Sequence, residues 1–216
     1  MHPINACKQL VATLLISLAA STAWADVDSD IQTLQKRWAE VNYQLEGKDQ
    51  LNAYEALVYD ATRVVKKYPD SAPAWLWSGI IKSTYAGAKG GLGALKLAKA
   101  SKTDLERSIE LDPETMQGSA YTSLGTLYFN VPGWPIGFGD DDKAETLLLK
   151  ALEINPNGID SNYFYADFLY SEGRYREAET FLLKAQAAPK RVDRPLADAG
   201  RQQEISEKLN KVRQEF

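Results

Sequence analysis

The side chains best suited to covalent or acid–base chemistry lie close together at the start of the chain. His2 is the only histidine and Cys7 the only cysteine, and both precede Asp26. If the first 25 residues are removed, the rest of the chain has no thiol nucleophile, no disulfide, no imidazole base and no Cys/His ligands for zinc. Catalysis would then rest on carboxylates, lysines or tyrosines. The sequence therefore predicts a protein that is not an enzyme and holds no metal or cofactor.

Residues 1–25 have the composition of a secretory signal peptide. Lys8 provides a short positive region, Leu10 to Ala20 form an apolar stretch, and Ser21 to Ala25 place small residues where a signal peptidase cuts. The apolar stretch is shorter than the roughly 20 residues that a transmembrane helix needs. We expect cleavage before Asp26 and a periplasmic or secreted product; a retained anchor is the alternative.

The acidic and glycine-rich segments that remain match no known catalytic or phosphate-binding pattern. Asp160 and Asp167 lie seven residues apart, on one face of a helix, but no nucleophile elbow or metal-ligand set accompanies them. Residues 140–142, three consecutive aspartates, lack the alternating spacing of a calcium loop and are expected to cap a helix. The glycines of residues 87–93 fit neither the P-loop nor the dinucleotide fingerprint, so a flexible turn is expected there.

Charge and hydropathy argue against two kinds of partner. The chain has 25 basic and 29 acidic side chains, a net charge of −4, and the loss of Lys8 with the signal makes it −5. This mild acidity gives no electrostatic reason to expect nucleic acid or an anionic membrane. No segment after residue 25 is long and apolar enough to span a membrane. We therefore expect neither nucleic-acid binding nor stable membrane insertion.

The chain repeats a pattern of paired helices in which small and large residues alternate at fixed points. The clearest copy has a first helix with the spacing Tyr121-x2-Leu124-Gly125-x2-Tyr128. Its second helix has the small residues Ala144 and Ala151, with Leu148 between them and Pro156 after it. Small residues at these points allow helices to cross closely, and large ones fill the gaps between successive pairs. The unit that follows has Ala166, Gly173, Tyr175, Ala178, Leu182 and Ala185 in the same frame, and an earlier one has Trp75, Ser78, Gly79, Ser101, Leu105 and Ser108.

This spacing resembles that of tetratricopeptide repeat (TPR) proteins, which are built from 34-residue helix pairs. The resemblance implies an all-α, TPR-type helical repeat solenoid of antiparallel helix pairs, here with expanded loops between the two helices of a pair. Ten extra residues fall within the pair that starts near Trp75 and seven within the pair that starts near Tyr121. The second insertion and its flank, residues 132–144, also resemble exported TPR proteins related to the T component of TRAP-type transporters.

The predicted organisation has four parts. Residues 1–25 form the signal peptide, and residues 26–70 form a degenerate helix pair or N-terminal cap, with Leu57 where a small residue belongs. Residues 71–190 form the TPR array of about three repeats. Residues 191–216 form a linker and a last amphipathic helix, about 197–213, which we expect to be a solvent-facing cap because it has few apolar positions.

The resemblance also indicates which residues face the concave groove of the array. In the TPR frame these are Leu76, Ile80, Ser83, Thr84, Ser119, Thr122, Thr126, Phe129, Asn130, Asp160, Tyr163, Asp167, Tyr170 and Ser171. We take Thr122, Thr126, Phe129, Asn130, Tyr163, Asp167 and Tyr170 as the candidate binding surface. Such a mixture of aromatic, hydroxyl and carboxylate groups suits an extended peptide. Alternatively, Phe129, Tyr163 and Tyr170 pack against neighbouring helices.

A second candidate surface lies at the edge where the loops within the helix pairs emerge. Residues 87–93 and 131–138 should be neighbours there, and Trp134 and Phe138 could close over a ligand. In the alternative, Trp134 covers the apolar surface of its own insertion. The sequence therefore predicts a scaffold that binds a protein or peptide through its groove and loop edge. A small-ligand-binding accessory component of a transport system is the alternative function.

Overall fold

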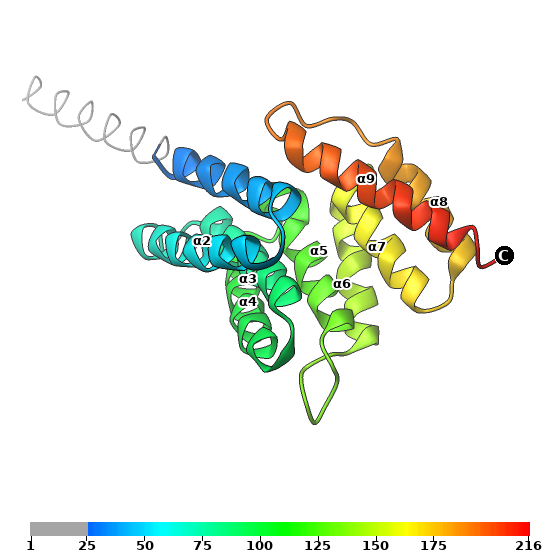
Figure 1. Cartoon of the computed structure of the whole chain (residues 1–216), viewed down its shortest axis with the longest axis horizontal. Helices are drawn as coiled ribbons and strands as arrows, with labels where there is room; N and C mark the ends of the chain where they lie inside the picture. The colour runs from blue at the N-terminus through cyan, green and yellow to red at the C-terminus, as the bar shows by residue number, and fades with distance from the viewer. Residues whose placement is uncertain (1–25) are drawn as a thin grey trace, which may run out of the picture.

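The computed structural model describes residues 26–216, and these residues are almost entirely helical (Figure 1). The predicted signal peptide and its cleavage site, residues 1–25, lie outside this part of the chain. A first helix covers residues 26–44. The helices that follow are α2 (Gly47–Lys67), α3 (Ala72–Lys89), α4 (Gly91–Leu111), α5 (Thr115–Asn130), α6 (Asp141–Ile154), α7 (Ile159–Ser171), α8 (Tyr175–Gln186) and α9 (Pro195–Val212).

These helices form antiparallel pairs that stack in chain order. α3 pairs with α4, α5 with α6 and α7 with α8, and α2 packs on α3. Residues 26–216 contain no β-strand, and their only strand-like feature is an isolated bridge between Gly133 and Gly139. The structure confirms the predicted all-α, TPR-type helical repeat solenoid.

The small residues of the repeat pattern lie where paired helices cross. A Cβ atom on Gly125 of α5 would lie 2.8 Å from Leu148 Cγ of α6 and 3.1 Å from the Ala144 carbonyl oxygen. A Cβ atom on Gly79 of α3 would lie 2.6 Å from Leu105 Cγ of α4. At these crossings the leucine of one helix occupies the space that a side chain on the other would need, so only glycine permits the spacing.

Capping and proline residues set the helix ends as the sequence predicts. The Asp140 carboxylate accepts a hydrogen bond from the Lys143 backbone N–H at 3.0 Å, which satisfies a free donor in the first turn of α6. The acidic run 140–142 therefore caps a helix. Ser71 caps α3, with Pro73 in its first turn.

The two insertions differ in structure. Residues 131–140 form a loop that projects from the array between α5 and α6 (Figure 1). Residues 87–93, expected to be a flexible turn, are instead mostly helical. Only Gly90 separates α3 from α4, and it adopts a left-handed φ of 64° that glycine tolerates best. The extra residues lengthen both helices because Ala94, Leu97 and Ala98 pack into the core.

The last helix, predicted to be a solvent-facing cap, exposes one face and buries the other. Ile205, Leu209 and Val212 of α9 are buried in the core of the array. The start of α9 reaches the first helix, where a Cβ atom on Gly200 would lie 2.3 Å from Tyr43 Cδ1. The segment before α9 therefore leads from α8 to residues 26–44, and α9 begins there and runs back along α7 and α8 (Figure 1). Leu196 and Ala197 at its start pack against the apolar cluster of the first helices, and Asp198 and Arg201 add ion pairs.

The helix crossings predict opposite effects for two Gly→Ala substitutions. Gly125→Ala forces Leu148 or the α6 backbone to move, and we expect it to lower the free energy of unfolding by about 1–3 kcal/mol. Gly87→Ala is the matched control, because a Cβ atom there meets nothing within 4 Å. It should be neutral or stabilise helix α3 by up to about 1 kcal/mol. Urea unfolding measures both, and equal stability of the two variants would contradict this account of the crossing.

Candidate functional site

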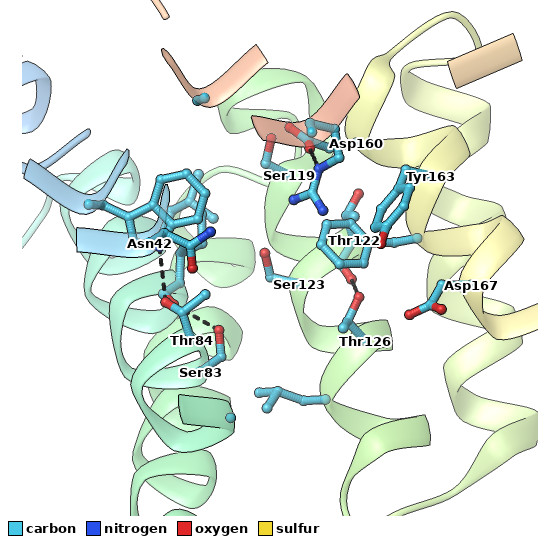
Figure 2. Close-up of a pocket in the computed structure, with 18 of the residues that line it drawn as sticks. Asn42, Ser83, Thr84, Ser119, Thr122, Ser123, Thr126, Asp160, Tyr163 and Asp167 are labelled. Carbon is cyan, nitrogen blue, oxygen red and sulfur yellow. Dashed lines mark hydrogen bonds and ion pairs between the residues drawn. The ribbon is translucent and has the colours of Figure 1, made fainter. Parts of the chain in front are cut away.

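The concave side of the array contains a cavity of about 1350 Å³. Its walls come from α3, α5 and α7, and the first helix, α9 and residues 189–194 close it over. Figure 2 shows side chains of α3 and α7 facing each other across the hollow, with those of α5 between them. The groove expected of a helical repeat is therefore partly enclosed by the two ends of the described chain.

Most of the predicted groove residues line this cavity. Of the candidate binding surface, Thr122, Thr126, Asn130, Tyr163 and Asp167 do so. The other groove positions that line it are Leu76, Ile80, Ser83, Thr84, Ser119 and Asp160. The helical frame thus brings one face of each first helix to a shared surface, as repeats stacked in register must do.

Phe129 and Tyr170 are placed elsewhere. Phe129 packs edge-on against Phe168, with ring centroids 5.7 Å apart. Tyr170 is half-buried outside the cavity, where its hydroxyl donates to a Glu215 carboxylate oxygen at 3.4 Å and the Lys208 ammonium lies 4.8 Å from its ring. Both aromatic side chains contact neighbouring helices, because α7 and α9 occupy the space that an open groove would leave free.

The loop edge divides into an exposed and a packed part. Trp134 is 90% exposed, so it covers no apolar surface of its own insertion. Phe138 is half-buried and packs edge-on against Tyr128, with centroids 5.4 Å apart. Val131, Pro132 and Ile136 of this loop line the cavity, and so do Gly87 and Gly91 of the other insertion. The two insertions are therefore neighbours, but neither predicted aromatic residue lines the cavity.

Residues outside the repeat pattern complete the cavity. Gln35, Trp38, Asn42 and Tyr43 of the first helix line it, as do Lys190, Arg191, Arg194, Ala197, Arg201 and Glu204 near and within α9. Gln35, Trp38 and Asn42 share one helix face, as do Ala197, Arg201 and Glu204, but the repeat pattern does not include them, and only the tertiary structure turns these faces toward the cavity. The cluster of arginines at 191, 194 and 201 is the one feature of the composition that indicates a role for this segment.

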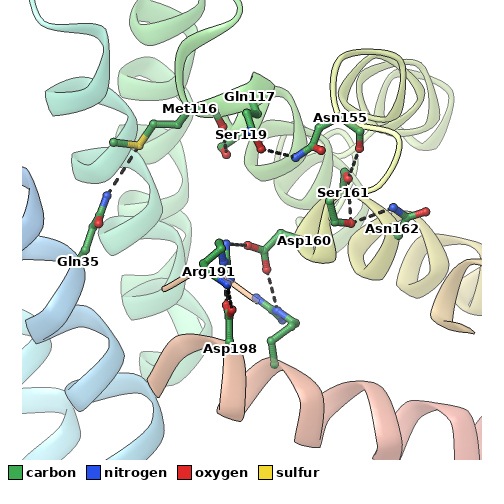
Figure 3. Close-up of polar contacts among 12 residues, drawn as sticks. Gln35, Met116, Gln117, Ser119, Asn155, Asp160, Ser161, Asn162, Arg191 and Asp198 are labelled. Atoms are coloured by element: carbon green, nitrogen blue, oxygen red, sulfur yellow. Dashed lines mark hydrogen bonds and ion pairs between the residues drawn. The ribbon is translucent and has the colours of Figure 1, made fainter. Parts of the chain in front are cut away.

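A network of ion pairs attaches this segment to α7. The Asp160 carboxylate accepts hydrogen bonds from Arg191 Nη1 at 2.7 Å and from Arg201 Nε at 2.9 Å. Arg191 also binds Asp198, with 2.7 Å between Nε and Oδ1, and Arg201 also pairs with Glu204. Figure 3 shows Asp160 and Asp198 on either side of Arg191. One carboxylate of α7 thereby connects the segment before α9 with α9 itself.

The electrostatics of this network suit binding and structure more than catalysis. Burial raises the pKa of Asp160, but the charges of Arg201 and Arg191 outweigh it and lower the pKa to about 2. Asp167, the other carboxylate of the predicted pair, binds Lys208 at 2.5 Å. Burial raises the pKa of Glu204, although Arg201 opposes the shift. Asp160 is thus held ionised and paired, which does not suit a general acid.

Two further properties concern only the part of the chain that the structure describes. Among residues 26–216, no cluster of His, Cys, Asp and Glu side chains has the arrangement to hold a metal ion. In the same range, no helix combines the length and apolar character needed to cross a membrane.

Comparisons with known proteins concern the fold. No family model and no curated protein matches the chain. Two similar solved structures are crystal structures of MamA. One covers 78% of this chain and 91% of its own, with 16% identity and a TM-score of 0.45. The other covers 84% and 91%, with 15% identity and a TM-score of 0.44. Because both TM-scores lie below 0.5, the assignment of the fold rests on the helix pairs described above.

The ion-pair network predicts a specific dependence of stability on pH. Because the folded-state pKa of Asp160 lies at about 2, below its usual 3.8, its contribution is present above pH 4 and is lost as pH falls toward 2. This contribution is about 2 kcal/mol. Asp160→Asn removes the carboxylate shared by Arg191 and Arg201, which keep Asp198 and Glu204 as partners, and it should cost about 2 kcal/mol at pH 7.

Urea unfolding at pH 7, 5 and 3 tests this prediction. The difference in stability between the wild type and Asp160→Asn should shrink as the pH falls. The control is Glu55→Gln, at an exposed position in the middle of α2, which should change stability by less than about 0.5 kcal/mol. A difference that stays constant from pH 7 to pH 3 would show that the charge of Asp160 does not hold α9.

Proposed function

We propose that this protein is a non-catalytic scaffold that holds an extended peptide segment of a partner protein in its central cavity. The observation that carries the proposal is the partly enclosed concave face of α3, α5 and α7, a cavity of about 1350 Å³. Binding pockets for a single small molecule are typically about 300–1000 Å³. An extended peptide of several residues would fill a cavity of this volume more completely than a single small molecule.

The chemistry of the lining supports a peptide. Ser83 of α3 and Ser119, Ser123, Thr126 and Asn130 of α5 line the cavity with uncharged polar side chains. All but Ser123 donate to backbone carbonyls of their own helices, so their oxygen atoms are the groups that can accept hydrogen bonds from a ligand. An extended peptide carries one N–H and one C=O on nearly every residue, and these must find partners when the peptide leaves water. Polar groups repeated along a helix wall meet this need, and the nearby apolar residues provide contact area.

A small ligand is the second candidate, and the closure of the cavity favours it. α9 reaches the first helix at Gly200 and Tyr43, so the concave side is not open along its length. A shorter ligand would be enclosed more easily than a segment of a folded partner. This arrangement would suit an accessory component of a transport system, in line with the likeness to the T component of TRAP-type transporters.

We propose further that the protein is exported. The proposal rests on the positive, apolar and small-residue regions of residues 1–25. To test this, the chain is expressed from Met1 in cells with a secretory pathway, and the intact mass and N-terminal sequence of the recovered protein are measured. The expected N-terminus is Asp26, and a protein that still begins at Met1 would contradict export with cleavage.

The peptide hypothesis is tested with a substitution that fills the cavity. Ser123→Phe places a large ring in the hollow from α5, where the serine is half-buried. The purified protein is mixed with a defined pool of N-acetylated hexapeptides with free C-termini, and retained peptides are identified by mass spectrometry. We expect the wild type to retain a subset of the pool and Ser123→Phe to lose it at least tenfold.

The matched control makes the same substitution outside the cavity. Ser206→Phe lies at an exposed position of α9 and should retain the same peptides as the wild type. Retention of the same peptides by all three proteins would refute binding in the cavity. If the wild type retains no peptide but native mass spectrometry shows a small molecule that Ser123→Phe lacks, the second candidate replaces the first.

A further inference from the structure

Arg194 is a cation of the cavity that has no carboxylate partner among residues 26–216. It precedes α9 and lines the cavity, and none of the ion pairs within that range involves it. Its Nε atom is buried and has no hydrogen-bond acceptor in the described chain. Buried polar groups are nearly always hydrogen-bonded, and an unpaired buried charge is costly, so this side chain requires an explanation.

Three of the neighbouring carboxylates already bind other arginines. Asp160 binds Arg191 and Arg201, Asp198 binds Arg191, and Glu204 binds Arg201. The carboxylate of Asp193, which also lines the cavity, lies at an exposed position and forms no ion pair with Arg194 in the described chain. Arg194 therefore lies beside a network whose buried carboxylates are all engaged with other arginines. Burial and the charge of Arg191 both lower the pKa of Arg194, which reflects a guanidinium without close compensation.

Two tryptophans hold the guanidinium in place. The guanidinium carbon of Arg194 lies 4.9 Å from the ring centroid of Trp77 and 6.0 Å from that of Trp38. The indole N–H groups are directed elsewhere, since Trp38 donates to Thr84 Oγ1 at 3.0 Å and Trp77 to the sulfur of Met116 at 3.2 Å. The rings are thereby fixed, and the arginine is preorganised by cation–π contact while its charge remains available.

We infer that Arg194, with Trp38 and Trp77 as its walls, is a subsite that binds the carboxylate of the ligand. The planar guanidinium matches a carboxylate in geometry, and the aromatic walls suit an apolar group next to it. A single uncompensated charge balances one carboxylate, whereas a phosphate brings a charge of about −1.5 to −2. The chain itself is acidic, so an anion must be attracted by this local cation and not by the overall charge.

This inference rests on the proposed function and specifies its ligand. A carboxylate can come from the C-terminus of a peptide or from a small organic acid, and the subsite recognises the chemistry common to both. A purely structural clamp, in which Arg194 only joins residues 189–194 to the first helix and α3, predicts a different result. Removing such a clamp would lower stability and leave carboxylate binding unchanged.

The test follows the Nε–H signal of Arg194 by NMR of ¹⁵N-labelled protein, with the signal assigned by its loss in Arg194→Gln. The probes are phenylacetate and its uncharged analogue phenylacetamide. We expect a saturable shift with the acid and at least tenfold weaker binding of the amide, because a hydrogen bond between charged groups is lost. Arg194→Gln should bind phenylacetate at least tenfold more weakly, with an unchanged or raised melting temperature.

Two control variants separate charge from geometry. Arg176→Gln removes the same charge from an exposed arginine that also lies over an aromatic ring, Phe216, but outside the cavity. It should bind phenylacetate as the wild type does. Arg194→Lys keeps the charge and loses the planar fork, so its affinity should fall between those of the wild type and Arg194→Gln.

The outcomes distinguish the source of the carboxylate and the two proposals. A hexapeptide that binds with a free C-terminus but not as its C-terminal amide identifies a peptide terminus; binding of phenylacetate alone identifies a small acid. Equal binding of acid and amide, tighter binding of inorganic phosphate, no binding of any acid, or unchanged binding by Arg194→Gln overturns the inference. If the Arg194 test fails but the wild type binds peptides and Ser123→Phe does not, the proposed function stands without the Arg194 subsite. If Arg194 responds to phenylacetate but no peptide binds, the peptide function fails and the subsite stands.

Discussion

The close crossing of the two helices in each pair is the constraint on which this structure depends. At Gly79 and Gly125 a leucine from the partner helix fills the space beside the glycine Cα atom, so the pairs have a narrow, reproducible width. Units of equal width stack in register, and stacked units must present the same face of each first helix on one side. The concave surface of α3, α5 and α7 is therefore a consequence of packing at these crossings.

The ends of the described chain convert that surface into a cavity. The segment before α9 and α9 itself close part of the concave side, and Asp160 holds them there through Arg191 and Arg201. An ion pair of this kind is more specific than an apolar contact, because each carboxylate binds particular guanidinium groups at particular positions. The same ion pairs occupy the carboxylates of Asp160 and Asp198, so the Arg194 guanidinium packs against Trp38 and Trp77 without a carboxylate partner in the described chain. Closure of the cavity and the position of Arg194 within it thus have one origin.

The cavity contains groups for recognition more than groups for chemistry. Its hydroxyl and amide side chains lie on rigid helices, and its strongest charges are paired with each other. Asp160 and Asp167, the carboxylate pair that the sequence places on one helix face, are both bound to basic side chains. A binding surface of this kind gains specificity from fixed donors and acceptors and from the desolvated arginine, without requiring a reactive group.

The repeat spacing was sufficient to predict the helix pairs, the capping role of residues 140–142 and the face of α5 and α7 that lines the cavity. These features are local or nearly so: small residues at helix crossings, acidic residues in a first turn and a period of 3.6 residues are all visible along the chain. The resemblance to TPR proteins implied that Thr122, Thr126, Asn130, Tyr163 and Asp167 share one surface. It could not show that Phe129 and Tyr170 would pack against neighbouring helices. The position of a residue in the repeat gives the side of the helix on which it lies, but it does not show which other helix lies beside that side.

The tertiary structure alone decided the path of α9, the closure of the concave side and the role of Arg194. Each depends on contacts between segments far apart in the chain, such as Gly200 with Tyr43 and Arg194 with Trp38. Polar contacts of this kind leave no periodic pattern, since a single arginine or aspartate can pair with any segment that the fold brings near. The sequence by itself thus determined the repeating unit and its inner face. Only the three-dimensional packing of the two ends of the described chain determined that this face would become a partly enclosed cavity, with Arg194 placed against Trp38 and Trp77.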